Sequence, residues 1–177
     1  KYLGEVKNLN KIIKKTKLKN ILGIVAIGDN IKRKQVCLEA NKINKQFKWG
    51  NVIHPAAVIS PSAIIGSGNM ILAGSIICAE TTIENHVSIN TGSHIDHNNK
   101  FCNFSSTGPG VATGGNVEVG EQSFLGIGAV VKHNISIGKN TIVGGQAFVN
   151  KNCKPNSIYY GVPAKRIKKR LLFKSYL

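Results

Sequence analysis

His97 and Gly115 are the two residues whose types and spacing first suggest chemistry. A histidine can take a proton as a general base near neutral pH. The backbone N–H of a glycine can donate to an oxyanion that approaches it closely. The two positions lie eighteen residues apart, and Asp96 and Asn98 flank the histidine. If the fold places positions eighteen residues apart side by side, base and oxyanion donor share one site.

Metal-binding chemistry is not expected from this sequence. Of the five histidines, His94 and His97 lie close together, and no third histidine follows at a spacing that completes a zinc site. The four cysteines are widely separated: Cys37, Cys78, Cys102 and Cys153. Their spacing is typical of neither a metal knuckle nor a redox pair. We therefore expect no metal, and free thiols in a reducing cytoplasm.

A six-residue repeat supplies the elements that would position the two residues. From Ile53 to Val149, fifteen of the seventeen positions at steps of six are large and apolar, and Thr107 and Thr113 are the exceptions. A period of six fits a short strand followed by a turn, because an α-helix repeats about every 3.6 residues. Three such units close a triangular coil of eighteen residues whose rungs are about 4.8 Å apart. Gly115 then lies on the rung next to His97.

Charge is distributed unevenly along the 177 residues, whose net charge is +16. Residues 1–48 carry 13 basic and 3 acidic side chains. Residues 49–150 carry 3 basic and 5 acidic side chains, and residues 151–177 carry 8 basic side chains and no acidic one. Nucleic-acid grooves run along a basic body with interleaved aromatic residues. The repeat has neither property, so we do not expect a nucleic-acid partner.

The two basic ends are expected to fold differently from the repeat. Residues 21–27 have the pattern of a buried strand and residues 30–44 that of a helix. Residues 167–177 alternate apolar and basic side chains, which predicts a short amphipathic helix packed on the coil or on a neighbouring subunit. Peripheral contact of this helix with anionic lipid is the alternative. The longest apolar run is far shorter than the roughly 18 residues of a membrane span.

Three stretches, in this order, carry a resemblance to a known family. The first stretch consists of AIGDN at 26–30, Arg33 and IHP at 53–55. The second is NTGSHIDH at 90–97, and the third is GVPAKR at 161–166. Together with the repeat they resemble the left-handed parallel β-helix sugar acetyltransferases. Within that family they are similar to bacterial UDP-4-amino-sugar N-acetyltransferases of glycan and O-antigen synthesis.

The resemblance implies a fold, a reaction and a set of site residues. The fold would be mainly β, a left-handed parallel β-helix over residues 51–154, after a small and apparently truncated Rossmann-like α/β part over 1–50 and before a C-terminal segment over 155–177. The reaction would be acetyl transfer from acetyl-CoA to a nucleotide-linked amino sugar, in a cytoplasmic homotrimer. Implied residues are His97, Asp96, Asn90 and Gly115 for catalysis, Ser106, Gly115, Gly126, Gly144, Lys165 and Arg166 for the cofactor, and Gly28, Asn30 and Arg33 for the substrate.

Two positions depart from the family pattern. Relatives often carry a carboxylate directly after the histidine, where this chain has Asn98, so either Asp96 or Asn90 is expected to orient the imidazole. Relatives of the amino-sugar type often have a second histidine where this chain has Ser106. O-acetylation of a sialic-acid-type hydroxyl, a non-catalytic scaffold and a nucleic-acid binder remain the alternative functions.

Overall fold

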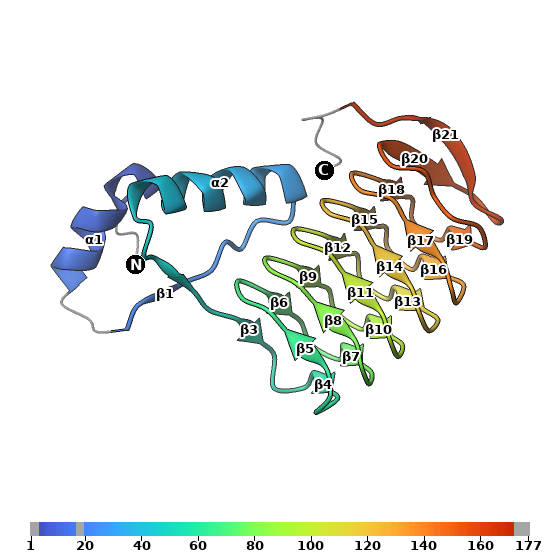
Figure 1. Cartoon of the computed structure of the whole chain (residues 1–177), viewed down its shortest axis with the longest axis horizontal. Helices are drawn as coiled ribbons and strands as arrows, with labels where there is room; N and C mark the ends of the chain where they lie inside the picture. The colour runs from blue at the N-terminus through green and yellow to red at the C-terminus, as the bar shows by residue number, and fades with distance from the viewer. Residues whose placement is uncertain (1–3, 17–19, 172–177) are drawn as a thin grey trace.

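The fold is described from a computed structural model, which places residues 4–16 and 20–171. Its body is a triangular β-helix, with a small α/β unit at the N-terminal end and a β-hairpin at the C-terminal end (Figure 1). The hand of the coil is left. None of the helices in the described ranges combines the length and the apolar character needed to cross a membrane.

Three sheets form the faces of the prism, and within the coil each takes every third strand in parallel alignment. The covered face contains β3 (Val52–Ile53), β6 (Met70–Ile71), β9 (Ser88–Ile89), β12 (Ser106–Thr107), β15 (Phe124–Leu125), β18 (Ile142–Val143), β20 (Ser157–Tyr160) and β21 (Lys165–Lys169). This face is extended beyond the coil by β20 and by β21, which is antiparallel to β20. The apolar face contains β4 (Val58–Ile59), β7 (Ile76–Ile77), β10 (His94–Ile95), β13 (Ala112–Thr113), β16 (Val130–Val131) and β19 (Phe148–Val149). The charged face contains β5 (Ile64–Ile65), β8 (Thr82–Ile83), β11 (Lys100–Phe101), β14 (Glu118–Val119) and β17 (Ser136–Ile137).

The register between neighbouring strands confirms the expected coil of eighteen residues. His94 pairs with Ala112 and Ile95 with Thr113 in parallel alignment. The second residue of each strand points inward, and the inward side chain is almost fully buried from Ile71 onward. Burial of this aliphatic column is the main favourable contribution to the stability of the coil.

Three edges join the faces, and each is a stack of turns. The histidine edge, residues 78–81, 96–99 and 114–117, joins the apolar face to the charged face. The docking edge, residues 84–87, 102–105 and 120–123, joins the charged face to the covered face. The glycine edge, residues 90–93, 108–111, 126–129 and 144–147, joins the covered face to the apolar face.

Close stacking explains the glycines at the second repeat position. A Cβ on Gly108 would lie 2.7 Å from the backbone nitrogen of Ile127, and a Cβ on Gly126 would lie 2.5 Å from that of Gly145. These glycines are therefore required because the next turn passes close to them. Relief of backbone strain applies instead to glycines at turn positions with a positive φ, such as Gly110.

The N-terminal unit contains η1 (Val6–Asn8), α1 (Leu9–Thr16), β1 (Leu22–Gly23), α2 (Asn30–Ile43) and β2 (Lys48–Trp49). The strand expected over residues 21–27 is reduced to β1, which pairs in parallel with β2. The helix expected over 30–44 is confirmed as α2, and Asp29 caps it by accepting a hydrogen bond from the Lys32 N–H. Figure 1 shows α2 beginning beside the coil and running back toward α1.

The C-terminal hairpin corrects one expectation. Residues 165–169 form β21, which pairs antiparallel with β20, where an amphipathic helix was expected from residue 167 onward. The alternation of basic and apolar residues fits an exposed strand on the last turn as well as it fits a helix. Residues 172–177 of that expected helix lie outside the described residues.

Candidate active site

The His97 side chain lies on the histidine edge, directly after β10. Its backbone N–H donates to Asp96 Oδ1 at 2.8 Å, and its ring Nδ1 lies 2.8 Å from Asn98 Oδ1. An amide oxygen can only accept, so this bond places the hydrogen on Nδ1. The lone pair of the ring is then on Nε2, which is the form that a general base requires.

Gly115 lies against the His97 ring, as the register predicted. A Cβ at this position would lie 2.5 Å from both Cε1 and Nε2 of the imidazole. Any other residue would displace the ring, so the geometry requires glycine here. The Gly115 carbonyl accepts from the Asn134 N–H, whereas its own N–H bonds no acceptor in the described part of the chain. This N–H is available to stabilise an oxyanion next to Nε2.

Asn98 contacts the ring nitrogen, and neither Asp96 nor Asn90 does. Asp96 Oδ1 accepts from the backbone N–H of His97 and not from its ring. Asn90 is on the glycine edge, where its Oδ1 accepts from the Thr91 N–H at 2.8 Å. The expectation that Asp96 or Asn90 orients the imidazole is therefore corrected to Asn98. Its left-handed φ of 55° is tolerated because asparagine visits this region more readily than most residues.

Two inward-facing threonines were missed, one beneath the His97 turn and one beneath the glycine edge, although the sequence carried a signal for them. Thr113 Oγ1 accepts from the Asp96 N–H at 3.3 Å, and Thr107 Oγ1 accepts from the Asn90 N–H at 2.8 Å. These are the two exceptions in the apolar column of the repeat. A polar residue at a core position is stable only with a hydrogen-bond partner, so both exceptions indicate neighbouring turns that need support.

A shallow depression adjoins the histidine edge on the apolar face. Its volume is about 230 Å³, and it is lined by Ile76, Cys78, His94, Ile95, Asp96 and Thr113. No group of three or more histidine, cysteine or acidic side chains in the described ranges is arranged to hold a metal ion.

The expected substrate residues Asn30 and Arg33 are buried, as is Ser106, which was expected to bind the cofactor. The exposed fractions of these residues are 0%, 0% and 2%. Arg33 Nη2 donates to Asn30 Oδ1 and to Ser106 Oγ, each at 2.7 Å. Arg33 is thus bonded to the coil through Ser106, so the expectation of direct ligand contact is wrong for these three side chains. Gly28 is exposed, and its carbonyl accepts from Arg33 Nη1 at 3.0 Å.

Two titratable groups are buried in the same junction between α2 and the docking edge. Cys37 Sγ lies 3.4 Å from His86 Nδ1. Burial, with a smaller contribution from the Arg33 charge, lowers the pKa of His86 to about 4. Burial also raises the pKa of the Cys37 thiol to about 11. Both groups are therefore neutral at pH 7. The pair contributes to the packing of the junction and does not form a reactive thiolate.

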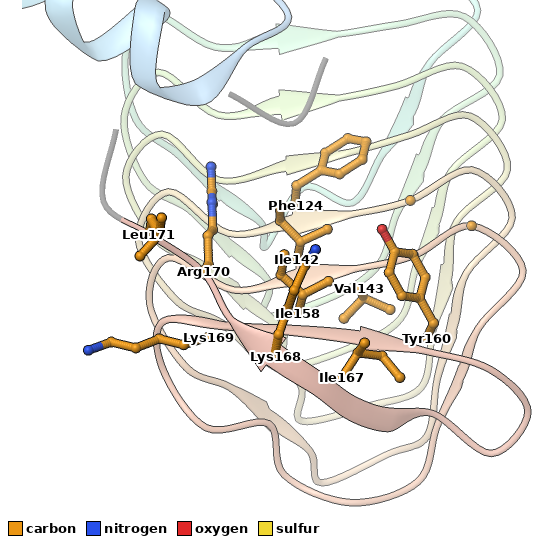
Figure 2. Close-up of a pocket in the computed structure, with 13 residues that line it drawn as sticks. Phe124, Ile142, Val143, Ile158, Tyr160, Ile167, Lys168, Lys169, Arg170 and Leu171 are labelled. Atoms are coloured by element: carbon orange, nitrogen blue, oxygen red, sulfur yellow. The ribbon is translucent and has the colours of Figure 1, made fainter. Parts of the chain in front are cut away.

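Gly126 and Gly144 line a cavity on the covered face under β21. Its volume is about 530 Å³. Figure 2 shows Phe124, Ile142 and Ile158 along its floor and Lys168 beside it. Gly144 also faces the Tyr160 ring so closely that a Cβ would overlap it. The stacking of the coil is therefore sufficient reason for both glycines.

Lys165 and Arg166 begin β21 and are exposed. Arg166 Nε donates to Ser157 Oγ at 2.8 Å, which leaves the remaining guanidinium donors directed to solvent or to a ligand. Four of the expected cofactor residues, Gly126, Gly144, Lys165 and Arg166, thus lie on the glycine edge and the C-terminal hairpin, whereas His97 and Gly115 lie on the histidine edge. One copy of the chain does not bring the two groups together.

Comparisons with known proteins agree with this architecture. Residues 116–151 match the bacterial transferase hexapeptide family (six repeats). PerB from Caulobacter crescentus, solved with CoA and GDP-perosamine, is 37% identical with a TM-score of 0.83 over 89% of this chain and 74% of PerB. A mutant of perosamine N-acetyltransferase from the same organism, with the same ligands, is 36% identical with a TM-score of 0.83 over 89% of this chain and 73% of that one.

A second solved relative comes from another organism. The acetyltransferase domain of PglB from Neisseria gonorrhoeae, in complex with acetyl coenzyme A, is 32% identical with a TM-score of 0.78 over 81% of this chain and 69% of that one. The order of the three sequence stretches, the eighteen-residue coil and these likenesses agree. The chain therefore belongs to the left-handed β-helix family of hexapeptide-repeat sugar N-acetyltransferases.

Proposed function

We propose that this protein transfers the acetyl group of acetyl-CoA to the amino group of a nucleotide-linked amino sugar, of the 4-amino-4,6-dideoxy type. The observation that carries the proposal is the His97 ring on Gly115, with a basic Nε2 and an available N–H side by side. The relatives solved with CoA and GDP-perosamine support the choice of both substrates.

His97 and Gly115 divide the chemistry between them. The amine nitrogen attacks the thioester carbon, and His97 Nε2 takes the proton that the nitrogen must lose. The carbonyl oxygen becomes an oxyanion, to which the Gly115 N–H donates. When the carbon–sulfur bond breaks, the imidazolium returns the proton to the sulfur, and CoA leaves as the thiol. Asn98 keeps the ring in the tautomer that starts the cycle.

Acetyl-CoA is proposed to lie between the histidine edge of one copy and the glycine edge of another. The thioester must reach Gly115, and the phosphates of CoA suit the exposed charges of Lys165 and Arg166. Gly126 and Gly144 add no side chains of their own to the glycine edge. Because these groups are on different edges of one copy, the site requires a neighbour.

We propose that the protein is a homotrimer, and the apolar face supports this proposal. Outward residues of this face include Val58 and Val130, which are 61% and 43% exposed, and Ile127 on the adjoining glycine edge is 61% exposed. The charged face instead carries ion pairs such as Lys100 with Glu84 at 3.3 Å. Apolar surface on one face of a soluble protein usually marks an interface. A ring of three copies would cover it and bring each histidine edge to a glycine edge.

The decisive experiment measures thiol release from acetyl-CoA with a panel of UDP-, dTDP- and GDP-linked amino sugars. We expect turnover with at least one of them and none with sialic acid or another hydroxyl acceptor. Replacing His97 by Asn should lower kcat by about 10²–10⁴-fold, since a general base is lost, while acetyl-CoA binding is nearly unchanged. Undiminished turnover in this variant, or thiol release with hydroxyl acceptors alone, would overturn the proposal.

A further inference from the structure

A row of backbone carbonyls faces outward from the docking edge. His86, Phe104 and Gln122 stack on successive turns with φ of 56°, 59° and 57°. Each N–H in the row bonds the turn below, to Ser67, Asn85 and Asn103. The left-handed conformation at these positions directs the carbonyl oxygens away from the coil, where they need donors from outside it.

Arginine side chains supply these donors. Arg33 donates to His86 O from Nε at 2.9 Å and to Phe104 O from Nη2 at 3.1 Å. Arg170 Nη1 donates to Gln122 O on the next turn at 3.1 Å. The row is thus bonded from the N-terminal unit at two turns and from the C-terminal segment at a third.

The same Arg33 guanidinium also bonds the turn that precedes α2. Nη1 donates to Ile27 O at 2.7 Å and to Gly28 O at 3.0 Å. Nη2 reaches Asn30 Oδ1 as well, and Ser106 Oγ on β12 contacts both Arg33 and Asn30. A guanidinium is a rigid, planar group with donors in fixed directions. It therefore fixes both the distance and the angle between the Gly28 turn and the coil.

Burial makes this joint rigid. Arg33 is 0% exposed, and its five N–H groups lie within hydrogen-bond distance of seven acceptor oxygens of described residues. A buried charge is tolerated only while its donors are satisfied, so small displacements of α2 are strongly opposed. Lys34 bridges the same helix to Glu121 at 2.6 Å, but both side chains are partly exposed, and such pairs contribute little.

We propose that Arg33, supported by Asn30 and Ser106, is a positioning residue for the acetyl transfer. It holds the exposed Gly28 turn of the N-terminal unit at a fixed place relative to the coil that carries His97. The inference rests on the proposed function and on the substrate role that the family resemblance implies for Gly28, which is exposed. The nucleotide end of the acceptor would bind the N-terminal unit at this turn while the amine reaches the histidine edge. Arg33 has no exposed surface with which to touch the acceptor itself.

The test compares two acceptors that differ only in the nucleotide. One is the nucleotide-linked amino sugar that the wild-type protein uses best in the panel, and the other is the methyl glycoside of the same amino sugar. The variants are Arg33→Lys, which keeps the charge but not the planar set of donors, and Ser106→Ala, which removes one partner. Lys34→Gln is the matched control, because it removes an exposed bridge between the same two elements.

We expect Arg33→Lys to lower kcat/KM for the nucleotide-linked acceptor at least about 10-fold, mainly through KM, because the acceptor is no longer held in register with the base. Ser106→Ala should give a smaller loss of the same kind. Kinetic constants for the methyl glycoside and the KM for acetyl-CoA should change less than twofold, as should all constants of Lys34→Gln. A loss of positioning affects only the acceptor that spans both units.

Amide hydrogen exchange gives a readout that does not depend on turnover. In Arg33→Lys, exchange should accelerate over residues 30–43, while strands β10 and β13 keep their protection. Equal losses with both acceptors, or faster exchange throughout the coil, would indicate a general structural role and overturn the inference. Unchanged kinetics and exchange would overturn it as well. A wild-type protein that acetylates neither acceptor would instead overturn the proposed function, and the positioning role with it.

Discussion

The histidine edge and the docking edge share one backbone repeat but expose it differently. On the histidine edge, His97 and Asn98 are exposed, and the Gly115 N–H has no acceptor among the described residues. On the docking edge, His86 is buried and the outward carbonyls are bonded by arginines. The comparison teaches that a turn of this coil presents an open backbone N–H and exposed side chains, or forms a joint to another element, according to what covers it, since the turn itself hardly changes.

Gly115→Ala should give the largest effect, and it should affect activity far more than stability. The added methyl group would occupy the place of the His97 ring, so kcat should fall by about 10²-fold or more through loss of the aligned base and donor. Gly74→Ala is the control, because its left-handed φ of 67° is strained by a side chain but its Cβ meets nothing closer than 3.9 Å. Steady-state kinetics and thermal melting of both variants would separate the two effects. Comparable kcat values in the two variants would contradict the proposed role of Gly115.

Asn98→Asp tests whether residue 98 contacts the His97 ring during turnover. A carboxylate beside the ring favours the protonated imidazole, so the acid limb of the kcat/KM profile should move up by about one pH unit. Activity above that limb should be retained, since the new carboxylate would still accept from Nδ1 and aspartate tolerates a left-handed φ. A pH–rate profile measured from pH 5 to 9 checks this. An unshifted acid limb would show that residue 98 does not contact the base during turnover.

His86 should make the docking edge sensitive to acid without affecting the chemistry directly. Its pKa is lowered from 6.5 to about 4 in the folded protein, so the unfolded chain binds the extra proton between these values. Stability should therefore decrease as the pH falls from about 6.5 to about 4, by at most about 1.4 kcal/mol per pH unit. His86→Asn, which also tolerates a positive φ, should flatten this dependence. The measurement is the urea unfolding midpoint of the wild-type protein and of His86→Asn between about pH 4 and about pH 6.5. An equal decrease of the midpoint in both proteins would exclude His86 as the cause.

Thr113→Val should give the smallest effect. The bond from the Asp96 N–H to Thr113 Oγ1 is long at 3.3 Å, and its loss should cost about 1 kcal/mol. Turnover should fall only a few-fold, because Asp96 supports the turn that carries His97 without touching the imidazole. Melting temperature and kcat would be compared with those of Val131→Thr, which places a hydroxyl at the next apolar position without a known partner. A decrease in kcat as large as that of Gly115→Ala would show that Thr113 contributes more than support.

The repeat made the histidine edge predictable, because every coil has eighteen residues and the sequence separation therefore sets which residues are neighbours. A separation of eighteen residues was sufficient to place Gly115 against His97. The docking edge was not predictable in this way. Arg33 follows a turn that resembles a substrate loop, and nothing local shows that its side chain folds inward onto carbonyls of His86 and Phe104, more than fifty residues away. The strand at residues 165–169 was missed because its pairing with β20 is decided by the hairpin rather than by its own alternation.

Phe104 has a strained backbone conformation, and its side chain contacts a residue of α2. A bulky residue at φ 59° costs of the order of 1–3 kcal/mol relative to ordinary backbone geometry. Its ring stacks on His86 at 4.9 Å and lies beneath the Lys34 ammonium. A coil lacking α2 would keep this strain and lose the lysine contact, so asparagine or glycine would suit that turn better. The choice of phenylalanine shows that the sequence of the coil is adapted to the helix that rests on it.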